Sequence, residues 1–294
     1  MVKLLSAFAP AKINLFLRVA GRRPDGYHEL DSIFIPVSLC DRIGIETRPA
    51  STSAVTLRCN LRSLPADERN LAVRAASFFM AEFSLAAEVL IDLHKEIPVG
   101  AGLGGGSSDA GTVLRMMAAL FRIDSPNRLA EIALKLGADV PFFLNPVPAR
   151  VGGIGERITP LDWKPNFALV IAVPPIEVST AEIFRALKPV SWSGVAPEND
   201  LRRILAGEIA PALLVNDLAP AAISRWPRIG EALTMIEKSG ALAASMTGSG
   251  SAVFGIFATA AKAQEAAAQL RRQDPELRII VASTYLPWRS QPSC

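Results

Sequence analysis

The chain has 294 residues, of which 50% are hydrophobic and 20% are charged. This balance is typical of a globular protein that buries a sizeable core, and it excludes an intrinsically disordered chain. The net charge of +3 is small and dispersed, so the composition gives no indication of nucleic-acid binding.

The cysteines, the histidines and the lengths of the apolar stretches indicate which kinds of protein this chain is not. Three cysteines form no CxxC pair and there are only two histidines, so we expect a reduced, cytoplasmic protein with neither a disulfide framework nor a His-rich metal site. The N-terminal segment MVKLLSAFAPA has too short an apolar core for a signal peptide. The later stretch FALVIAVPP is far shorter than a membrane span, so we expect no membrane partner.

The first half of the chain mixes short apolar strands with amphipathic helices. Alternating or continuous apolar residues bounded by turn formers predict strands over residues 12–21, 30–37, 41–47, 54–59 and 87–99. Between the first two strands, Pro24, Asp25 and Gly26 predict a loop. Apolar residues at helical spacing predict helices over residues 68–83, 107–121 and 125–137.

Proline and glycine are concentrated between residues 141 and 165, where we place a domain boundary that divides the chain into 1–160 and 161–294. The second half predicts strands over residues 167–173, 242–250, 251–257 and 277–284, and helices over residues 179–187, 228–240 and 259–273. This order is typical of an α+β layer in which helices cover one face of an antiparallel sheet. The last strand either completes this sheet or packs back on the first domain.

One stretch, PVGAGLGGGSSDAG at residues 98–111, contains six glycines. Each glycine gives up side-chain burial and costs backbone entropy on folding, so a packed core does not favour such a stretch. It connects a predicted strand to a predicted helix, and the first turn of a helix presents unpaired N–H groups to an anion. Because glycines let phosphate oxygens approach the main chain, the stretch predicts a phosphate site, with Ser107 or Ser108 as the N-cap of the helix.

Other interpretations of this stretch stay open on the residues alone. Residues 100–105 match G-x-G-x-x-G, which would make the protein an NAD(P)-dependent oxidoreductase, with Asp124 near the offset of the acid that binds ribose. Asp124, however, follows a predicted helix rather than a second strand. A Walker A loop is excluded, because no Lys-Ser or Lys-Thr follows the glycines. A tight turn without a ligand is a further alternative.

Three segments together resemble the superfamily of galactokinase, homoserine kinase, mevalonate kinase and phosphomevalonate kinase. They are APAKINLFL at residues 9–17, PVGAGLGGGSSDA at 98–110 and MTGSGSAVF at 246–254. Within it, GRRPDGYHEL, LGADVPFF and GIGERITPL resemble the kinases that act on a cytidine-diphosphate-linked methylerythritol. The resemblance implies a two-domain α+β fold. Its N-terminal domain would be like domain 2 of ribosomal protein S5, and a cleft would separate it from a C-terminal α+β domain.

The resemblance also implies an activity: ATP-dependent phosphorylation of the 2-hydroxyl of 4-diphosphocytidyl-2-C-methyl-D-erythritol, in non-mevalonate isoprenoid biosynthesis. Another superfamily kinase, acting on mevalonate, homoserine or a sugar, is the alternative within the class, and the DGYH element argues against it. A non-catalytic nucleotide-binding protein is disfavoured because Lys12 and Asp139 are both intact. We expect a monomer or a weak dimer whose partners are these small molecules.

Individual site residues follow from the resemblance by motif. It implies that Asp139 accepts the hydroxyl proton and that Lys12 holds this carboxylate and offsets phosphoryl charge. Without the resemblance, Asp139 would be interpreted as a helix cap. For the cytidyl substrate the implied residues are Asn14, Tyr27, His28, Thr180 and Phe184, although Phe184 also fits the core of its helix. The residues implied at ATP are Asn70, Lys95, Pro98, Gly100, Ala101, Gly102, Leu103, Gly104, Gly105, Gly106, Ser107 and Ser108, with Ser107 also near Mg²⁺.

Overall fold

The computed structural model describes residues 2–285 and divides them into two compact units, each built from separate stretches of the sequence. The first unit holds the described residues up to Ala11 together with Leu39–Val99 and Gly104–Pro146. The second unit holds Lys12–Ser38, Gly100–Leu103 and the described residues from Val147 onward. These units follow contacts rather than chain order, so a division of the chain at residue 160 stays a prediction.

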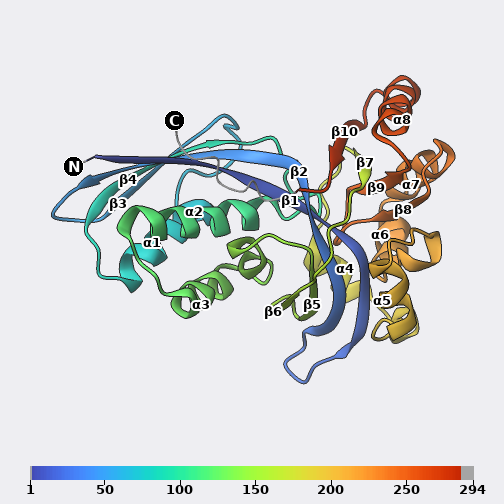
Figure 1. The fold of residues 1–294 in the computed structure, drawn as a ribbon, viewed down its shortest axis with the longest axis horizontal. Helices are drawn as coiled ribbons and strands as arrows, with labels where there is room; N and C mark the ends of the chain where they lie inside the picture. Colours follow the sequence, from blue (N-terminus) through green and yellow to red (C-terminus); the bar gives the residue numbers. More distant parts are fainter. Residues whose placement is uncertain (1, 286–294) are drawn as a thin grey trace. The chain divides into compact units, whose positions relative to one another are not determined.

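The first unit is a sheet segment with helices on one face (Figure 1). It contains all or part of β1 (Lys3–Arg22), β2 (His28–Pro49), β3 (Ala54–Cys59), α1 (Leu71–Glu82), β4 (Ala87–His94), α2 (Gly105–Phe121), α3 (Pro126–Leu136) and the 3-10 helix η1 (Val140–Leu144). β3 runs parallel to β4, and β4 pairs antiparallel with β2 in a register that aligns His94 with Arg42. β1 also pairs with β2.

The helices of the first unit form because their apolar residues recur at helical spacing and share one buried face. In α2, the side chains of Ala110, Val113, Leu114 and Met117 have no exposed surface, and the same is true of Phe79 in α1. Full burial of a side chain such as valine, leucine, methionine or phenylalanine stabilises a fold by roughly 1.5–3 kcal/mol. These side chains join those of β2, β3 and β4 in one hydrophobic core, which fixes where α2 begins.

The second unit contains a four-stranded antiparallel sheet in the order β10-β7-β9-β8. Helices α7 and α8 contact each other and pack on this sheet (Figure 1), which confirms the predicted α+β layer. Besides parts of β1 and β2, the unit contains β5 (Ala149–Gly153), β6 (Arg157–Pro160), β7 (Ala168–Val173), α4 (Thr180–Ala186), η2 (Pro189–Ser191), α5 (Glu198–Leu205), η3 (Pro211–Leu213), α6 (Ala219–Arg225), α7 (Pro227–Lys238), β8 (Ala243–Met246), β9 (Val253–Phe257), α8 (Ala260–Gln273) and β10 (Arg278–Ser283).

The last strand, β10, completes the sheet of the second unit by pairing antiparallel with β7. Just beyond it, Thr284 forms a β-bridge with Val37 of β2, and the Tyr285 N–H donates to the Pro36 carbonyl over 2.7 Å. The end of the chain's described part therefore contacts both the sheet and β2.

Three strand predictions differ from the structure. The strands expected over residues 30–37 and 41–47 are one continuous strand, β2, because its first part pairs with β5 and its second part pairs with β4. β1 starts at Lys3 rather than at residue 12. The stretch 141–165, expected to be an irregular boundary, contains the antiparallel pair of β5 and β6.

Candidate active site

The glycine stretch connects β4 to α2, as the sequence predicts, but its serines do not cap the helix. The N-cap is Gly104, whose φ of 71° is in the left-handed region that favours glycine. The first helical hydrogen bond runs from the Ser108 N–H to the Gly104 carbonyl over 2.8 Å. The Ser108 hydroxyl donates instead to the carbonyl of Pro10 over 2.7 Å. The first turn of α2 therefore has no side-chain cap, and an anion site at its N–H groups stays a prediction.

The glycines of this stretch serve different purposes. Around a Cβ placed on Gly100 there is open space. A Cβ on Gly105 would lie 2.9 Å from Ile97 Cγ2, so this glycine is required by packing. Within the second unit, a Cβ on Gly102 would overlap the Thr247 carbonyl, and the Thr247 hydroxyl donates to the Gly102 carbonyl over 3.3 Å. Two of the glycines are thus explained by close contacts with the protein itself, whereas no atom of the protein lies near the side-chain position of Gly100.

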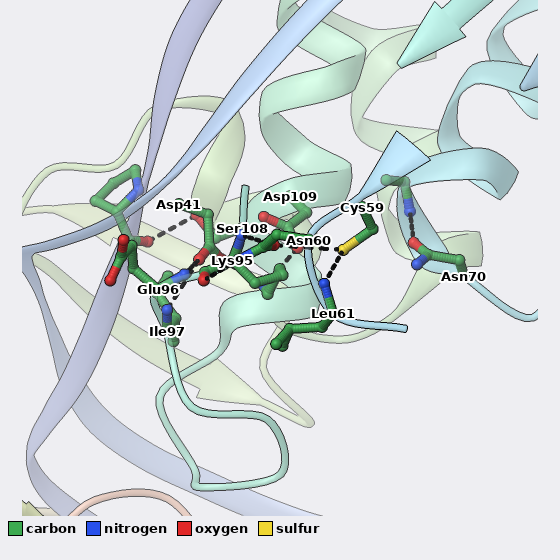
Figure 2. A network of polar contacts seen from close by, with 12 residues as sticks. Asp41, Cys59, Asn60, Leu61, Asn70, Lys95, Glu96, Ile97, Ser108 and Asp109 are labelled. Carbon is green, nitrogen blue, oxygen red and sulfur yellow. Dashed lines mark hydrogen bonds and ion pairs between the residues drawn. The ribbon is translucent and has the colours of Figure 1, made fainter. Parts of the chain in front are cut away.

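A buried charge cluster lies at the start of α2 in the first unit, and Figure 2 shows its hydrogen bonds. The Lys95 ammonium donates to Asp109 Oδ2 over 2.6 Å and also to Asp41 Oδ2. Asp41 Oδ1 accepts the backbone N–H groups of Glu96, over 2.6 Å, and Ile97, over 2.9 Å. Lys95, the residue after β4, thereby connects β2 to α2 through its hydrogen bonds.

Burial and charge shift the pKa values within this cluster. Burial raises the pKa of Asp109 to about 8, and the neighbouring Asp41 adds to the rise while Lys95 opposes it. Burial acts to lower the pKa of Lys95, but the charges of Asp109 and Asp41 outweigh it, so the pKa of the lysine is raised. Lys95 therefore stays charged at neutral pH.

Asparagine side chains order the two chain segments next to this cluster. Asn60 Oδ1 accepts the Lys95 N–H over 2.7 Å, and Asn60 Nδ2 donates to the Lys95 carbonyl over 3.2 Å. Asn70 is the N-cap of α1 and accepts the Ala72 N–H over 3.0 Å (Figure 2). The sequence-based expectation named Lys95 and Asn70, whose roles at ATP stay predictions, and it did not include their neighbours Asp41, Asp109 and Asn60. The only sequence pattern that includes one of these three residues is the SSD of the glycine motif, whose aspartate is Asp109.

Asp139 immediately precedes η1, and its side chain makes no capping hydrogen bond. The interpretation as a structural cap is therefore wrong for the side chain, although the position is that of an N-cap. η1 packs against α2. A Cβ on Gly111 of α2 would lie 2.6 Å from Phe143 Cβ, so this glycine permits the close approach. Packing thereby fixes Asp139 within the same unit as the start of α2.

Lys12 belongs to the second unit, where it is 3% exposed. Its ammonium donates to Asn14 Oδ1 over 2.7 Å and lies 4.6 Å from the centre of the Phe34 ring. Asn14 Oδ1 also accepts the Gly248 N–H over 2.8 Å, and the Asn14 N–H donates to the Thr247 hydroxyl over 3.0 Å. Asn14 therefore holds both Lys12 and the turn between β8 and β9, and a contact of Asn14 with substrate stays a prediction.

The residues expected at the cytidyl substrate include an aromatic cluster in the second unit. The His28 and Phe184 rings are stacked, with centroids 5.3 Å apart and an interplanar angle of 28°. Trp192, which sequence reasoning missed, meets His28 edge-on at 5.8 Å. Burial, and less strongly the charge of Arg22, lowers the pKa of His28, so its ring is neutral at pH 7.

The remaining two residues expected at this substrate are also in the second unit. Tyr27 is 60% exposed. The hydroxyl groups of Thr180 and Ser249 lie 2.7 Å apart.

The structure therefore groups Lys95 with the start of α2 in one unit, and Lys12 with Asn14 and His28 with Phe184 in the other. Lys12 and Asp139 belong to different units, so their pairing stays a prediction. In the part of the chain that the structure describes, no three His, Cys, Asp or Glu side chains are grouped to hold a metal ion. Over residues 2–285, no helix has the length and apolar character needed to cross a membrane.

The dinucleotide interpretation of residues 100–105 is not favoured. That fingerprint needs a strand, the glycine turn, a helix and a second parallel strand. Here α2 is followed by α3 and then η1 rather than by a strand. Asp124 lies on the short connection between α2 and α3, so it does not end a second strand.

Comparison with known proteins places the whole chain among small-molecule kinases. The profile of the GHMP kinases N terminal domain matches residues 70–145, and that of the GHMP kinases C terminal domain matches residues 200–276. The 4-diphosphocytidyl-2-C-methyl-D-erythritol kinase of Pelotomaculum thermopropionicum is 40% identical, over 97% of this chain and 99% of the relative. That of Geobacter metallireducens is 42% identical, over 90% of this chain and 94% of the relative.

Solved structures agree with the sequence relatives. A crystal structure of 4-(cytidine 5′-diphospho)-2C-methyl-D-erythritol kinase is similar to this chain with a TM-score of 0.82 and 37% identity, covering 95% of this chain and 98% of that one. Homoserine kinase from Cytophaga hutchinsonii is similar with a TM-score of 0.74 and 17% identity, covering 96% and 95%. At that identity the second likeness concerns the fold alone.

Proposed function

This chain belongs to the 4-diphosphocytidyl-2-C-methyl-D-erythritol kinase family of the GHMP kinases, and from that membership we propose that it phosphorylates the 2-hydroxyl of 4-diphosphocytidyl-2-C-methyl-D-erythritol. ATP is the phosphoryl donor, and the products are the 2-phosphate and ADP. The observation that carries the proposal is 40% sequence identity, over nearly the full length of the chain, to kinases of that name. The reaction would serve non-mevalonate isoprenoid biosynthesis in the cytoplasm, with the protein a monomer or a weak dimer.

The ATP phosphates bind at the glycine stretch in this proposal. The N–H groups in the first turn of α2 are suitable hydrogen-bond donors for phosphate oxygens, and the space beside the main chain at Gly100 is open. Lys95 and Asn70 belong to the same unit as this helix start and take the nucleotide side of the site. Gly102 and Gly105 contribute backbone only, because neighbouring atoms of the protein occupy the place of a side chain.

Mg²⁺ fits the hydroxyl of Ser107, which lies in the first turn of α2 and is partly exposed. The Ser107 hydroxyl would be the protein's ligand to the ion, and a bound Mg²⁺ would offset negative charge on the phosphates. The protein supplies few ligands in such a site, because Mg²⁺ keeps several waters and binds mainly to the phosphates. A cluster of acidic ligands is therefore not required for this metal.

Asp139 is the proposed general base, which accepts the proton of the substrate hydroxyl. Asp139 belongs to the same unit as the start of α2, and its side chain does not serve as the cap of η1. Lys12 holds that carboxylate and offsets charge on the transferred phosphoryl group. The hydrogen bond from Lys12 to Asn14 and the Phe34 ring orient the ammonium, which saves reorganisation when substrate binds.

The cytidine end of the substrate binds at the aromatic cluster of the second unit. Tyr27, His28 and Phe184 supply rings that stack on a flat base, and the neutral His28 ring offers both a donor and an acceptor. Thr180 and Asn14 serve the polar part of the substrate.

Phosphate transfer by the purified protein tests the proposal. We expect the chain to convert the cytidyl substrate and ATP·Mg²⁺ to ADP and a phosphorylated product in equal amounts, measured by coupled ADP release and by phosphorus NMR. Mevalonate, homoserine and galactose should give no more ADP than a blank. ADP release with one of these and none with the cytidyl substrate would move the protein to another member of the superfamily.

A further inference from the structure

The proposed function gives Lys95 a place on the nucleotide side of the site, but it leaves the buried pairing of Lys95 with Asp41 and Asp109 without a role. Exposed fractions of their side chains are 3%, 0% and 4% respectively. The Lys95 ammonium is shared between the two carboxyl groups. Figure 2 shows all three side chains converging beside the start of α2.

Stability does not explain this cluster. A buried ion pair stabilises a fold little, because removing both charges from water costs about as much as their attraction returns. In addition, Asp109 Oδ1 is buried and accepts no hydrogen bond from any of the residues 2–285. A buried oxygen without a partner is unfavourable by itself. Apolar side chains of similar size would serve the core at least as well.

The position of the cluster in the chain points to the glycine stretch. Lys95 lies three residues before this stretch, and Asp109, fourteen residues later, lies near the end of the stretch in the first turns of α2. The ion pair of the two therefore ties together both ends of the stretch. Lys95 Nζ also lies 3.3 Å from where a Cβ on Gly105 would be, so the ammonium touches the first residue of α2.

Asp41 adds a third connection, from β2. Its second oxygen accepts the N–H groups of Glu96 and Ile97, the first two residues after Lys95. These hydrogen bonds fix the direction in which the chain leaves β4. Each of the three charged side chains thus restrains the backbone at one end of the glycine stretch or the other.

We propose that Asp41, Lys95 and Asp109 form an ionic clasp that closes the base of the glycine stretch and positions the start of α2 for the triphosphate of ATP. They are positioning residues, since none of them needs to touch the reacting atoms. The inference rests on the proposed role of this stretch in binding ATP. It predicts that opening the clasp weakens ATP binding without slowing phosphoryl transfer from bound ATP.

The experiment compares variants of the full chain that open the clasp to different extents. Calorimetric titration with ATP·Mg²⁺ gives the dissociation constant, and steady-state assays give kcat and KM for each substrate. Asp41→Ala and Asp109→Ala should weaken ATP binding about tenfold or more, with kcat at saturating ATP and KM for the cytidyl substrate within about threefold of wild type. Asp109→Asn keeps an oxygen that accepts from Lys95, so it should bind ATP within about threefold of wild type.

A control separates positioning from a general loss of stability. Ile132→Ala removes a core side chain of α3, 2% exposed, in the same unit, and so destabilises the unit while the clasp stays intact. We expect Ile132→Ala to keep wild-type ATP affinity at a temperature where it is folded. Equal weakening in Ile132→Ala and Asp41→Ala, or wild-type affinity in Asp109→Ala, would overturn the clasp. A wild-type protein that binds no ATP would instead overturn the proposed function, and the role of the clasp with it.

Discussion

Asp139 is the residue whose proposed role in the reaction, general base, can be tested by a single substitution. A carboxylate at the start of a 3-10 helix ordinarily accepts backbone N–H groups, and this one makes no capping hydrogen bond. We expect Asp139→Asn to lower kcat by about 100-fold or more, because an amide cannot accept the hydroxyl proton. ATP affinity should change little, since the amide keeps the size of the side chain. Steady-state kinetics and ATP titration check both parts.

The control for this substitution is Asp124→Asn, the same change at an exposed position on the connection between α2 and α3. It should leave kcat and both KM values unchanged. Full turnover in Asp139→Asn would remove this carboxylate from the reaction.

Phe184 is the second residue whose role can be separated from packing. Its ring is stacked on His28, and it also contributes to the edge of the second unit's core. Loss of an aromatic stack worth about 0.5–1.5 kcal/mol, plus lost contact area, should raise KM for the cytidyl substrate by roughly tenfold in Phe184→Ala. KM for ATP should stay the same, and Phe184→Tyr should keep near-wild-type values for both. If Phe184→Ala left KM for the cytidyl substrate unchanged, Phe184 would be a core residue without a role in substrate binding.

At the scale of elements, the glycine stretch packs against the turn between β8 and β9 so closely that a side chain at Gly102 would not fit. Gly100 and Gly102 both have positive φ, of 67° and 76°, so alanine at either position costs about 1–2 kcal/mol of backbone strain. Only at Gly102 would the new methyl group also overlap the backbone of Thr247. We expect Gly102→Ala to lower the free energy of unfolding in urea by more than Gly100→Ala does.

The same two variants also test, through KM for ATP, where the nucleotide lies on the glycine stretch. Gly102→Ala should raise KM for ATP because the stretch must move away from the turn. Gly100→Ala adds a methyl group on the open side and should affect ATP only if phosphate oxygens lie there. Equal losses of stability in both variants would show that the contact with Thr247 is not tight.

Sequence periodicity predicts elements that bury one continuous face. Helices α1, α2, α3, α7 and α8 lie within a few residues of their predicted ranges, since their apolar residues recur at helical spacing. The short helices α5 and α6 were not predicted, because segments of eight and seven residues give a weak periodic signal. β1 begins earlier than predicted because exposed Leu4 and Phe8 hide its alternation.

Some residues of the candidate site lie in short sequence motifs, whereas others are brought together only by the tertiary structure. The glycine stretch, Lys12 and Asp139 are visible in short motifs, so the resemblance supplies them. Asp41 is 54 residues from Lys95 in the sequence, and only the pairing of β2 with β4 brings the two together. Trp192 likewise joins His28 through tertiary packing. No local pattern marks contacts of that kind.

For the molecule as a whole, ligand linkage distinguishes a kinase from a dinucleotide enzyme without any assay of turnover. A ligand that binds only the folded state adds about 2.7 kcal/mol to the free energy of unfolding at 100 times its dissociation constant. For a domain of this size that corresponds to a rise of about 5 °C or more in the midpoint of thermal unfolding. We expect this rise with ATP·Mg²⁺ and none with NAD⁺ or NADP⁺ at the same concentration, measured by scanning calorimetry.

Two further arms make the thermal measurement specific. ATP with EDTA should give a smaller rise than ATP·Mg²⁺, because without the ion the phosphates keep charge that the Ser107 hydroxyl and the α2 amides must offset alone. Asp139→Asn should show the full wild-type rise, since the base is needed for transfer and not for holding ATP. A rise with NAD⁺ and none with ATP would contradict the kinase assignment, and a rise that EDTA leaves unchanged would contradict the magnesium site at the start of α2.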